Sequence, residues 1–536
     1  MYYSLEKREF INIDHFYKLE YEKYMVYYTG LIYLAHGIKS GKHSIDIILQ
    51  EYEGEGIQFC NIYGSYVILI ENKENKDIFM FSDNSSMSTI FYSEHYFGDN
   101  FIEMIRGMEN PQLNKKIICE YLTLTRGYYF ETFIKRIHML KASCCYEIKE
   151  GTIYVKNKNI GYLGDKSSIT DISSFFDDLA KSISDKKVIS ALTGGYDSRL
   201  VAGCLNGRLN FDLFISGNNE KSVEIKLSKK AAKSIQKELK VLSPDMKKVD
   251  KDEILKKTFI VSGGRACSNS SGLYRIDYFQ KELKRQGYEI LLTGDCGDMY
   301  KDCWYKQEFP FYYRKHTNVK LFYLTRMEFS NNSEFLGEMF YRYYKSQRKS
   351  IISELEKQKS GLAVRSYDRY GYIVAWEKSV FSRPIGDGMV TYSPLQELEL
   401  VKYSFLQPIH LKYFNYLQRQ VISSHSLELS KVPTTNGTNA SIDGLSVFKA
   451  LFVENVGQVK RLFRGLKRRL GDREKSMAKV MVEDDFDLRE STLSKKALEY
   501  CKKKNYINAR IDMNDIPITL LYKIIYLYQL GQVLDA

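Results

Sequence analysis

Hydrophobic and polar residues follow two different rhythms along this chain. Residues 1–160 contain short runs typical of β-strands, and the clearest pair covers residues 66–71 and 78–81 around a polar, charged turn. From residue 171 the rhythm changes. Residues 171–183 place their apolar side chains on one face of a helix, and residues 188–192 follow as a short apolar strand.

The alternation of strand and helix continues after this point. It predicts, in order, a helix over residues 197–205, a strand over residues 211–217 and a helix over residues 222–239 that Ser222 caps. Such alternation is typical of a mostly parallel sheet covered by helices. Beyond about residue 310 the pattern is chiefly helical. We therefore expect an α+β region over residues 1–160, an α/β region over residues 171–435, and a helical extension over residues 436–536 packed on the α/β region.

Composition limits the class of protein. A chain of 536 residues suggests two or three domains, and its formal charge of +13 permits an acidic ligand such as a nucleotide without demanding nucleic acid. The nine cysteines form no C-x-x-C pair, which favours a reduced cytoplasmic protein over a disulfide scaffold or a zinc module. No signal peptide is visible at the N-terminus, and the apolar run over residues 518–530 is too short for a transmembrane segment.

One stretch, "ALTGGYDSRL" at residues 191–200, joins a strand to a helix through paired glycines. A turn of this kind points backbone N–H groups and a helix N-terminus outward, which suits phosphate. The common phosphate loop is excluded because no lysine follows the glycines. A second strand, in "YEILLTGDCGDMYKD" at residues 288–302, ends on two acids. Since ligands bind beyond the carboxyl ends of strands in such sheets, we expect Asp295 and Asp298 to lie near Asp197.

Three carboxylates beside a phosphate-binding turn would repel the phosphates unless a cation lay between them. Mg²⁺ is the expected bridge, held by one or two carboxylates and by phosphate oxygens. The sequence therefore predicts that the turn binds the pyrophosphate end of ATP, with Asp197 and Asp298 as magnesium ligands.

These motifs carry a family resemblance. "LTGGYDSR" resembles the S-G-G-x-D-S pyrophosphate loop of the ATP pyrophosphatases, and "LLTGDCGDMY" resembles the S-G-E-G-x-D-E motif of the asparagine synthetase branch. That branch includes β-lactam synthetases and lasso-peptide cyclases. "RPIGDGMV" at residues 383–390 is placed like the family's R-x-P-F-L-D-x-x-L-V segment, with Pro384 and Asp387 retained. The resemblance covers roughly residues 175–435 and implies an α/β fold like that of the adenine-nucleotide α-hydrolases.

The resemblance implies a two-step ligation with ATP and Mg²⁺. A carboxylate attacks the α-phosphate and releases pyrophosphate, and ammonia or an amine then displaces AMP. Asp295 stands where the family has a glutamate near the reacting amine, and Arg199 follows the D-S pair, where a guanidinium suits a phosphate contact. These two are the expected catalytic residues. The family's late lysine has no clear counterpart, and Lys431 is a poor match. The implied nucleotide-binding residues are Leu192, Thr193, Gly194, Gly195, Asp197, Ser198, Ser216, Thr293 and Gly294.

The same family carries an N-terminal glutaminase domain with the fold of N-terminal nucleophile (Ntn) hydrolases. Its nucleophile is the cysteine after the initiator methionine, but this chain has Tyr2 there, and its first cysteine is Cys60. Of the glutaminase segment R-D-x-x-G-x-x-P-L-Y-Y, only Asp83 and the pair Phe91 and Tyr92 match. Because the reaction needs the thiol and the free α-amine together, we expect residues 1–160 to be glutaminase-like and inactive.

Three functions remain open. The first is an amide-forming ligase whose partners are a small-molecule or peptide carboxylate and an amine, with no nucleic acid; a homodimer is left open. The second is a tRNA-modifying ATP pyrophosphatase, which shares the first motif but has a catalytic cysteine pair that is missing here. The third is a nucleotide-binding relic without turnover.

Simpler structural roles compete with these. Asp197 and Ser198 are residue types that often cap a helix. Arg383 and Asp387 could form a structural salt bridge, and Cys296 could be a small buried side chain. Residues 460–471 are basic, with Leu462, Phe463, Leu466 and Leu470 on one face. Contact with a membrane surface or an acidic partner is one interpretation of that run. We favour a solvated helix that packs its apolar stripe against the protein.

Overall fold

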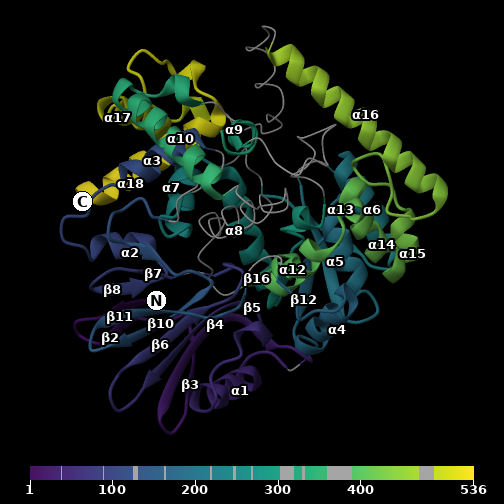
Figure 1. Cartoon of the computed structure of the whole chain (residues 1–536), viewed down its shortest axis with the longest axis horizontal. Helices are drawn as coiled ribbons and strands as arrows, with labels where there is room; N and C mark the ends of the chain where they lie inside the picture. Colours follow the sequence, from purple (N-terminus) through teal and green to yellow (C-terminus); the bar gives the residue numbers. More distant parts are fainter. Residues whose placement is uncertain are drawn as a thin grey trace.

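The computed structural model describes residues 1–37, 39–88, 90–124, 131–161, 165–217, 220–244, 249–266, 270–301, 319–328, 332–358, 389–469 and 488–536. Within these residues the strands form two antiparallel sheets and one parallel sheet. Figure 1 shows the antiparallel sheets around the N-terminus, at the bottom of the view, with helical groups at the upper left and on the right. The expected combination of antiparallel sheets, a parallel sheet and helices is confirmed at this level.

The two antiparallel sheets come from the N-terminal part of the chain. The first has the order β2 (Glu9–Asn12), β1 (Tyr2–Ser4), β8 (Tyr96–Gly98), β7 (Phe91–Tyr92) and β9 (His138–Met139). The second has the order β11 (Thr152–Asn157), β10 (Cys144–Lys149), β6 (Ile78–Ser82), β5 (Ile62–Asn72), β4 (Tyr24–Leu34) and β3 (Tyr17–Glu20). The strands predicted over residues 66–71 and 78–81 lie within β5 and β6, which pair with each other.

Strand β5 is buried on both faces, which explains its nearly continuous apolar sequence. Val67 and Leu69 pack into a cluster with β1 and β10, whereas Tyr66 and Ile68 pack on the opposite side. This alternation follows from the two-residue period of a strand. The second sheet is therefore a middle layer between the first sheet and the elements that follow in the chain.

The parallel sheet has the order β14 (Leu239–Leu242), β13 (Phe211–Ser216), β12 (Val188–Ala191), β15 (Ile290–Leu292) and β16 (Val390–Tyr392), and all its neighbours are parallel. Helix α4 (Ile172–Ser182) precedes β12, and the helices between β12 and β15 are α5 (Asp197–Leu205), α6 (Val223–Ser234), α7 (Lys251–Val261) and α8 (Ser270–Arg285). The predicted strand and helix at residues 188–192 and 197–205 correspond to β12 and α5. Since β13 and β15 flank β12 on opposite sides, the order of the strands reverses at β12.

One predicted helix is too long. Ser222 caps α6 as expected, through the amide of Ile225, but the helix ends at Ser234. Gln236 has a φ of 58°, a left-handed conformation that ends the helix, and Leu239 begins strand β14. An apolar residue at this spacing satisfies a helical and a strand pattern equally, so the sequence alone did not separate the two.

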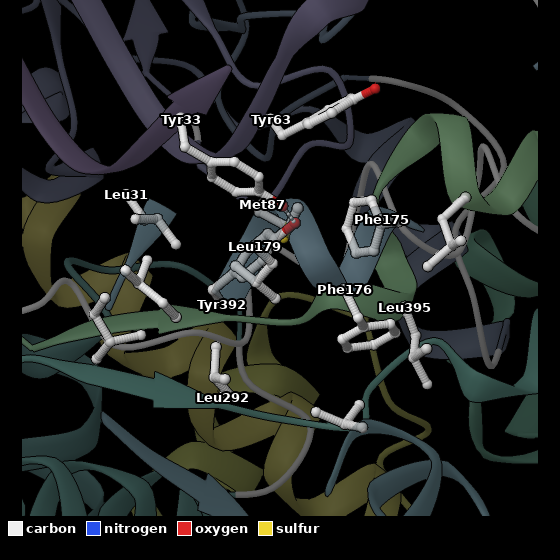
Figure 2. Close-up of a cluster of buried hydrophobic side chains, with 14 of the residues drawn as sticks. Leu31, Tyr33, Tyr63, Met87, Phe175, Phe176, Leu179, Leu292, Tyr392 and Leu395 are labelled. Carbon is white, nitrogen blue, oxygen red and sulfur yellow. Dashed lines mark hydrogen bonds between the residues drawn. The ribbon is translucent and has the colours of Figure 1, made fainter. Parts of the chain in front are cut away.

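A large hydrophobic cluster joins the second antiparallel sheet to the parallel sheet. Figure 2 shows part of it, in which Tyr33 and Tyr63 from β4 and β5 meet Phe175 and Phe176 from α4. Tyr392 of β16 belongs to the same cluster, and its hydroxyl lies 2.9 Å from that of Tyr33. The core therefore continues across residue 160, and the division into three regions stays a prediction.

A buried carboxyl group completes this junction. Glu397 accepts hydrogen bonds from the Gly64 amide and the Tyr392 hydroxyl, both at 3.1 Å. Burial raises the pKa of Glu397 to about 8. The two halves of the chain are thus joined by polar contacts as well as by apolar packing.

The remaining elements are helical. Beside the sheets lie α1 (Lys42–Glu53), η1 (Phe59–Asn61), η3 (Gly297–Tyr300), η8 (Pro394–Gln396), α12 (Leu398–Leu406), α13 (Ile409–Lys412), η9 (Tyr413–Asn415), α14 (Tyr416–His425), α15 (Leu427–Lys431) and α16 (Gly444–Arg469). A further group comprises α2 (Phe101–Arg106), α3 (Lys115–Thr123), α9 (Val319–Phe322), η5 (Tyr323–Met327), η6 (Asn332–Phe335), α10 (Glu338–Gln358), η10 (Leu488–Glu490), α17 (Thr492–Lys503), η11 (Met513–Asp515) and α18 (Ile518–Asp535).

Helix α18 lies against α2 and α3 of the N-terminal part and belongs to one hydrophobic cluster with α7. It is apolar on nearly every side, and a helix of that kind is stable only when neighbours cover it all round. The C-terminal helices therefore pack on the N-terminal part of the chain as well as on the α/β region. None of the helices in the described ranges combines the length and the apolar character needed to cross a lipid bilayer.

Candidate functional site

The two glycine turns leave the parallel sheet side by side. Strand β12 ends at Ala191 and β15 at Leu292, and the two strands are parallel neighbours with Ser190 opposite Leu292. The turn at residues 192–196 and the turn at residues 293–296 therefore start from the same edge of the sheet. The expected adjacency of the two motifs is confirmed.

The second turn needs glycines because it packs directly against the first residues of α5. A Cβ atom on Gly294 would lie 2.6 Å from the amide nitrogen of Ser198, and one on Gly297 would lie 2.1 Å from the Cγ atom of Asp197. Both distances are shorter than any stable contact between these atoms, so only glycine fits. Cys296, between them, is buried as expected and has a φ of 70°. The spacing of the second motif thus serves its packing on the first turn of α5.

Hydrogen bonds within the first turn fix its shape. The Ser198 hydroxyl accepts a hydrogen bond from the Thr193 amide at 2.9 Å, and the Thr193 hydroxyl accepts one from the Gly195 amide at 3.3 Å. The carbonyl of Gly194 accepts a hydrogen bond from the Thr435 amide at 3.0 Å. No side chain caps α5 at Tyr196, so the simpler role of Asp197 and Ser198 as helix caps is wrong. Ser198 instead ties the start of the helix back to the end of the strand.

Asp197 and Asp298 come together around a lysine. The Lys301 ammonium lies 2.8 Å from Oδ2 of Asp197 and 3.4 Å from Oδ1 of Asp298. The other oxygen of Asp197 accepts a hydrogen bond from the side-chain amide of Gln418, on α14, at 2.6 Å. The Lys301 side chain is only 17 % exposed, whereas that of Asp298 is 55 % exposed. A protein cation therefore occupies the position between the two predicted metal ligands.

This arrangement does not fit a magnesium ion held by Asp197 and Asp298. Magnesium takes an octahedral set of oxygens at about 2.0–2.1 Å, but both oxygens of Asp197 already contact protein donors, one of them cationic. Asp295, the third acid, accepts a hydrogen bond from the Thr293 hydroxyl at 2.8 Å. Over the part of the chain that the structure describes, no group of three His, Cys, Asp or Glu side chains lies close enough together to hold a metal ion. The predicted magnesium ligands are close together, but as a lysine-bridged pair.

A cavity of about 1350 Å³ opens beside the turns. It exceeds the roughly 300–1,000 Å³ of most small-ligand pockets. The first antiparallel sheet, the second antiparallel sheet, the parallel sheet and α8 all contribute to its wall. The predicted residues that line it are Thr193, Asp197, Ser198, Ser216, Thr293, Gly294 and Asp295. The wall carries charged side chains of both signs, among them Arg275 and Lys284 of α8 and the acids Asp99 and Glu224.

Other predicted residues do not line this cavity. Leu192 is fully buried, with its amide bonded to the Phe214 carbonyl, and neither glycine of the first turn nor Asp298 is part of the wall. Arg199 is also fully buried, and its guanidinium donates to the carbonyls of Val432 and Pro433, both at 2.7 Å. Burial lowers the pKa of Arg199 to about 10. Residues two apart on a helix face different ways, so Arg199 points away from Asp197 and the structure does not bring it to the site.

Of the remaining residues that the sequence singled out, one lies at the surface and three lie outside the described part of the chain. Lys431 is exposed and pairs with Glu428 at 2.6 Å. Arg383, Pro384 and Asp387 lie outside the described residues. Sequence reasoning missed Lys301 and Gln418. The spacing of Lys301, three residues after Asp298, was a signal for the first, whereas nothing in the sequence connects Gln418 with a turn more than 200 residues away.

The N-terminal part shows a second polar cluster on the same cavity. The Met1 amino group donates to Asp99 at 2.9 Å, and His15 contacts the other oxygen of Asp99 at 2.5 Å. Asp83 is buried and accepts hydrogen bonds from three amides of its own turn, which is a structural role. The Tyr2 ring stacks on Tyr96. None of the described residues that line the cavity is a cysteine.

At the turns, the start of α5 offers an anion backbone N–H donors, whereas Lys301 is already paired with Asp197 and Asp298. The only acids on the turns, Asp197, Asp295 and Asp298, are each paired or hydrogen-bonded within the protein. A scan against models of known protein families and a search of curated proteins found no match to this chain.

Proposed function

We propose that this chain is an ATP-dependent ligase like the asparagine synthetase family that its motifs resemble. The observation that carries the proposal is the interlocking of the two glycine turns at the edge of the parallel sheet. Gly294 and Gly297 are needed because the second turn packs directly on the first turn of α5, and both turns border a cavity large enough for a nucleotide and a second substrate. Ligands of open parallel sheets bind at this position, beyond the carboxyl ends of the strands.

The proposed reaction has two steps. A carboxylate oxygen attacks the α-phosphorus of ATP, the bond to the β-phosphate oxygen breaks, and pyrophosphate leaves. The nitrogen of ammonia or of an amine then attacks the acyl carbon, loses a proton and displaces AMP. Thr193, Ser198 and Thr293 would face the phosphate chain, because their side chains line the cavity at the turns.

Charge is the second requirement, since the phosphate chain brings several negative charges to the turns. Arg275 and Lys284 stand on the α8 wall of the cavity, and Lys301 pairs with Asp197 at the start of α5. Asp295, which lines the cavity, is the acid that would act near the reacting amine, as the resemblance implies. No step of this proposal runs through a magnesium ion. The Ntn-hydrolase-like and adenine-nucleotide-hydrolase-like fold assignments belong to the same proposal.

Two observations favour a second candidate function, the nucleotide-binding relic without turnover. Lys301 lies where the family resemblance implies a metal ion, and Arg199 is turned away from the cavity. A chain that has lost its metal site keeps the fold and the nucleotide pocket more readily than it keeps the chemistry. Binding and turnover must therefore be measured separately.

Binding of a fluorescent ATP analogue tests the shared part of both functions. We expect Gly294→Ala to weaken binding by about tenfold or more, a loss of about 1.4 kcal/mol, because the new methyl group displaces the start of α5. Gly457→Ala is the matched control, since a Cβ atom there meets no atom within 4 Å. Equal affinity in wild type and Gly294→Ala would contradict a nucleotide site at the turns.

Pyrophosphate release then separates the ligase from the relic. Purified protein is incubated with ATP, a panel of amino-acid and peptide carboxylates, and ammonia or an amine. Release that depends on the carboxylate and falls in Asp295→Asn, with unchanged nucleotide affinity, supports the ligase. Tight nucleotide binding without release for any member of the panel supports the relic.

A further inference from the structure

Helix α16 exposes a stripe of large apolar side chains along one face. It runs as a long helix at the right of Figure 1, at the margin of the molecule. The exposed fractions in this stripe are Leu445 80 %, Phe448 68 %, Phe452 62 %, Val459 43 % and Phe463 68 %. Their spacing of three, four and seven residues places them on one side of a helix. From the first to the last, the stripe is roughly 27 Å long at 1.5 Å per residue.

The opposite face attaches α16 to the protein. Ala450 and Gln458 on that face are buried. At the edge of the stripe, the Tyr413 hydroxyl of η9 donates to the exposed Asn455 side chain at 3.0 Å. Asp443 caps the start of the helix through the Ser446 amide. Because these contacts set the rotation of the helix, the stripe faces outward. The sequence predicted that Phe463 packs against the protein, and this is wrong because its side chain is exposed. The side chains of the other predicted stripe residues, Leu462, Leu466 and Leu470, lie outside the described residues.

The sequence of α16 is strongly basic. It contains Lys449, Lys460, Arg461, Arg464, Lys467, Arg468 and Arg469 and a single acid, Glu454. Lys449 and Lys460 are exposed next to the stripe. An outward apolar stripe with an excess of positive charge is the pattern of helices that lie in the interface of a bilayer.

We propose that α16 is a docking surface for anionic phospholipid membranes. The apolar stripe would enter the boundary between headgroups and acyl chains, and the basic residues would contact the headgroups. A second copy of α16 is a poor occupant, because it would bring the same net positive charge to the interface. A nucleic acid would satisfy the charge but would leave the phenylalanine and leucine side chains without an apolar partner.

Vesicle flotation of the full chain tests this surface. Wild type is mixed with vesicles of phosphatidylcholine alone or with about 30 % phosphatidylserine, at about 0.1 M and about 0.5 M salt. We expect binding to the anionic vesicles to be about tenfold or more stronger than to the neutral ones, and to weaken at the higher salt. Equal binding to both vesicle types, or binding to neither, overturns the proposal.

A matched pair of triple variants locates the contact. Phe448→Ser, Phe452→Ser and Phe463→Ser together should reduce binding to anionic vesicles by about tenfold or more. The control changes Tyr154, Val155 and Ile260 to serine, because these apolar side chains are similarly exposed elsewhere, at 51 %, 52 % and 67 %. Equal losses in both variants overturn the assignment to α16.

Two further outcomes also count against it. A wild-type dimer in light scattering that the phenylalanine variant loses would assign the stripe to a second copy. Release of bound vesicles by a short duplex DNA at equal charge would assign the basic residues to nucleic acid. Thermal melts check that the variants fold. If the phenylalanine variant does not fold, replacing Lys449 and Lys460, which are exposed next to the stripe, with glutamine tests the same surface through its charge.

Discussion

Replacing Asp197 with asparagine tests the polar contacts at the heart of the candidate site. The two oxygens of Asp197 accept from different donors, the Lys301 ammonium at 2.8 Å and the Gln418 amide at 2.6 Å. Asparagine has one acceptor, so its own NH₂ group must face one of these donors. The variant loses one hydrogen bond to a charged group, worth about 1.5–3 kcal/mol, and we expect the free energy of unfolding to fall by about 2 kcal/mol.

Asp298→Asn is the matched comparison, because it removes the same charge from the same lysine. Asp298 is 55 % exposed and its oxygen lies 3.4 Å from Lys301, and an exposed pair of this kind contributes about 0–1 kcal/mol. The two variants should therefore differ clearly, although the sequence motif gives both aspartates the same role.

A double-mutant cycle isolates the pair itself. Urea unfolding at pH 7, followed by circular dichroism, is measured for wild type, Asp197→Asn, Lys301→Met and the double variant. We expect a coupling of about 1–3 kcal/mol, the range for residues in direct contact. If the two single losses add up to the double loss within about 0.5 kcal/mol, Asp197 and Lys301 do not form a pair and the account of this site is wrong.

Three further predictions follow from other parts of the molecule. Burial raises the pKa of Glu397 from its usual 4.5 to about 8, so the folded chain keeps a proton that the unfolded chain has released. The free energy of unfolding should therefore fall as the pH rises from about 4.5 to about 8, and Glu397→Gln should remove that part of the slope of urea midpoints; parallel slopes in both proteins would contradict it. Gly297→Ala places a methyl group 2.1 Å from Cγ of Asp197 and should cost about 1–3 kcal/mol in urea unfolding, whereas Gly457→Ala, on exposed helix α16, should stabilise by about 0.5–1 kcal/mol. Because Tyr2 stands where a nucleophilic cysteine is needed, purified protein should release no glutamate from glutamine above a boiled control.

Local patterns in the sequence were enough to predict the main elements around the site. The short apolar runs of β5 and β6, the helical period of α4 and the alternation of strands and helices all depend on neighbours a few residues apart in the chain. The adjacency of the two glycine turns was also predictable, because the carboxyl ends of neighbouring parallel strands share one edge of a sheet. Where a spacing satisfied two periods, as at Leu239, the prediction failed.

The chemistry of the site depended on contacts that no local pattern encodes. Gln418 reaches Asp197 from α14, and Arg199 turns away because the carbonyls of Val432 and Pro433 receive its guanidinium. Lys301 lies close in sequence to Asp298, but only the packing of the second turn on α5 brings its ammonium to Asp197.

The outward face of α16 is a similar case, since an amphipathic sequence states which residues share a face but not which face the protein covers. The sequence by itself thus determined the elements and the edge of the sheet at which the turns meet. The tertiary structure decided which charges meet there, because the partner of a charged side chain is set by packing between segments that are distant in the chain.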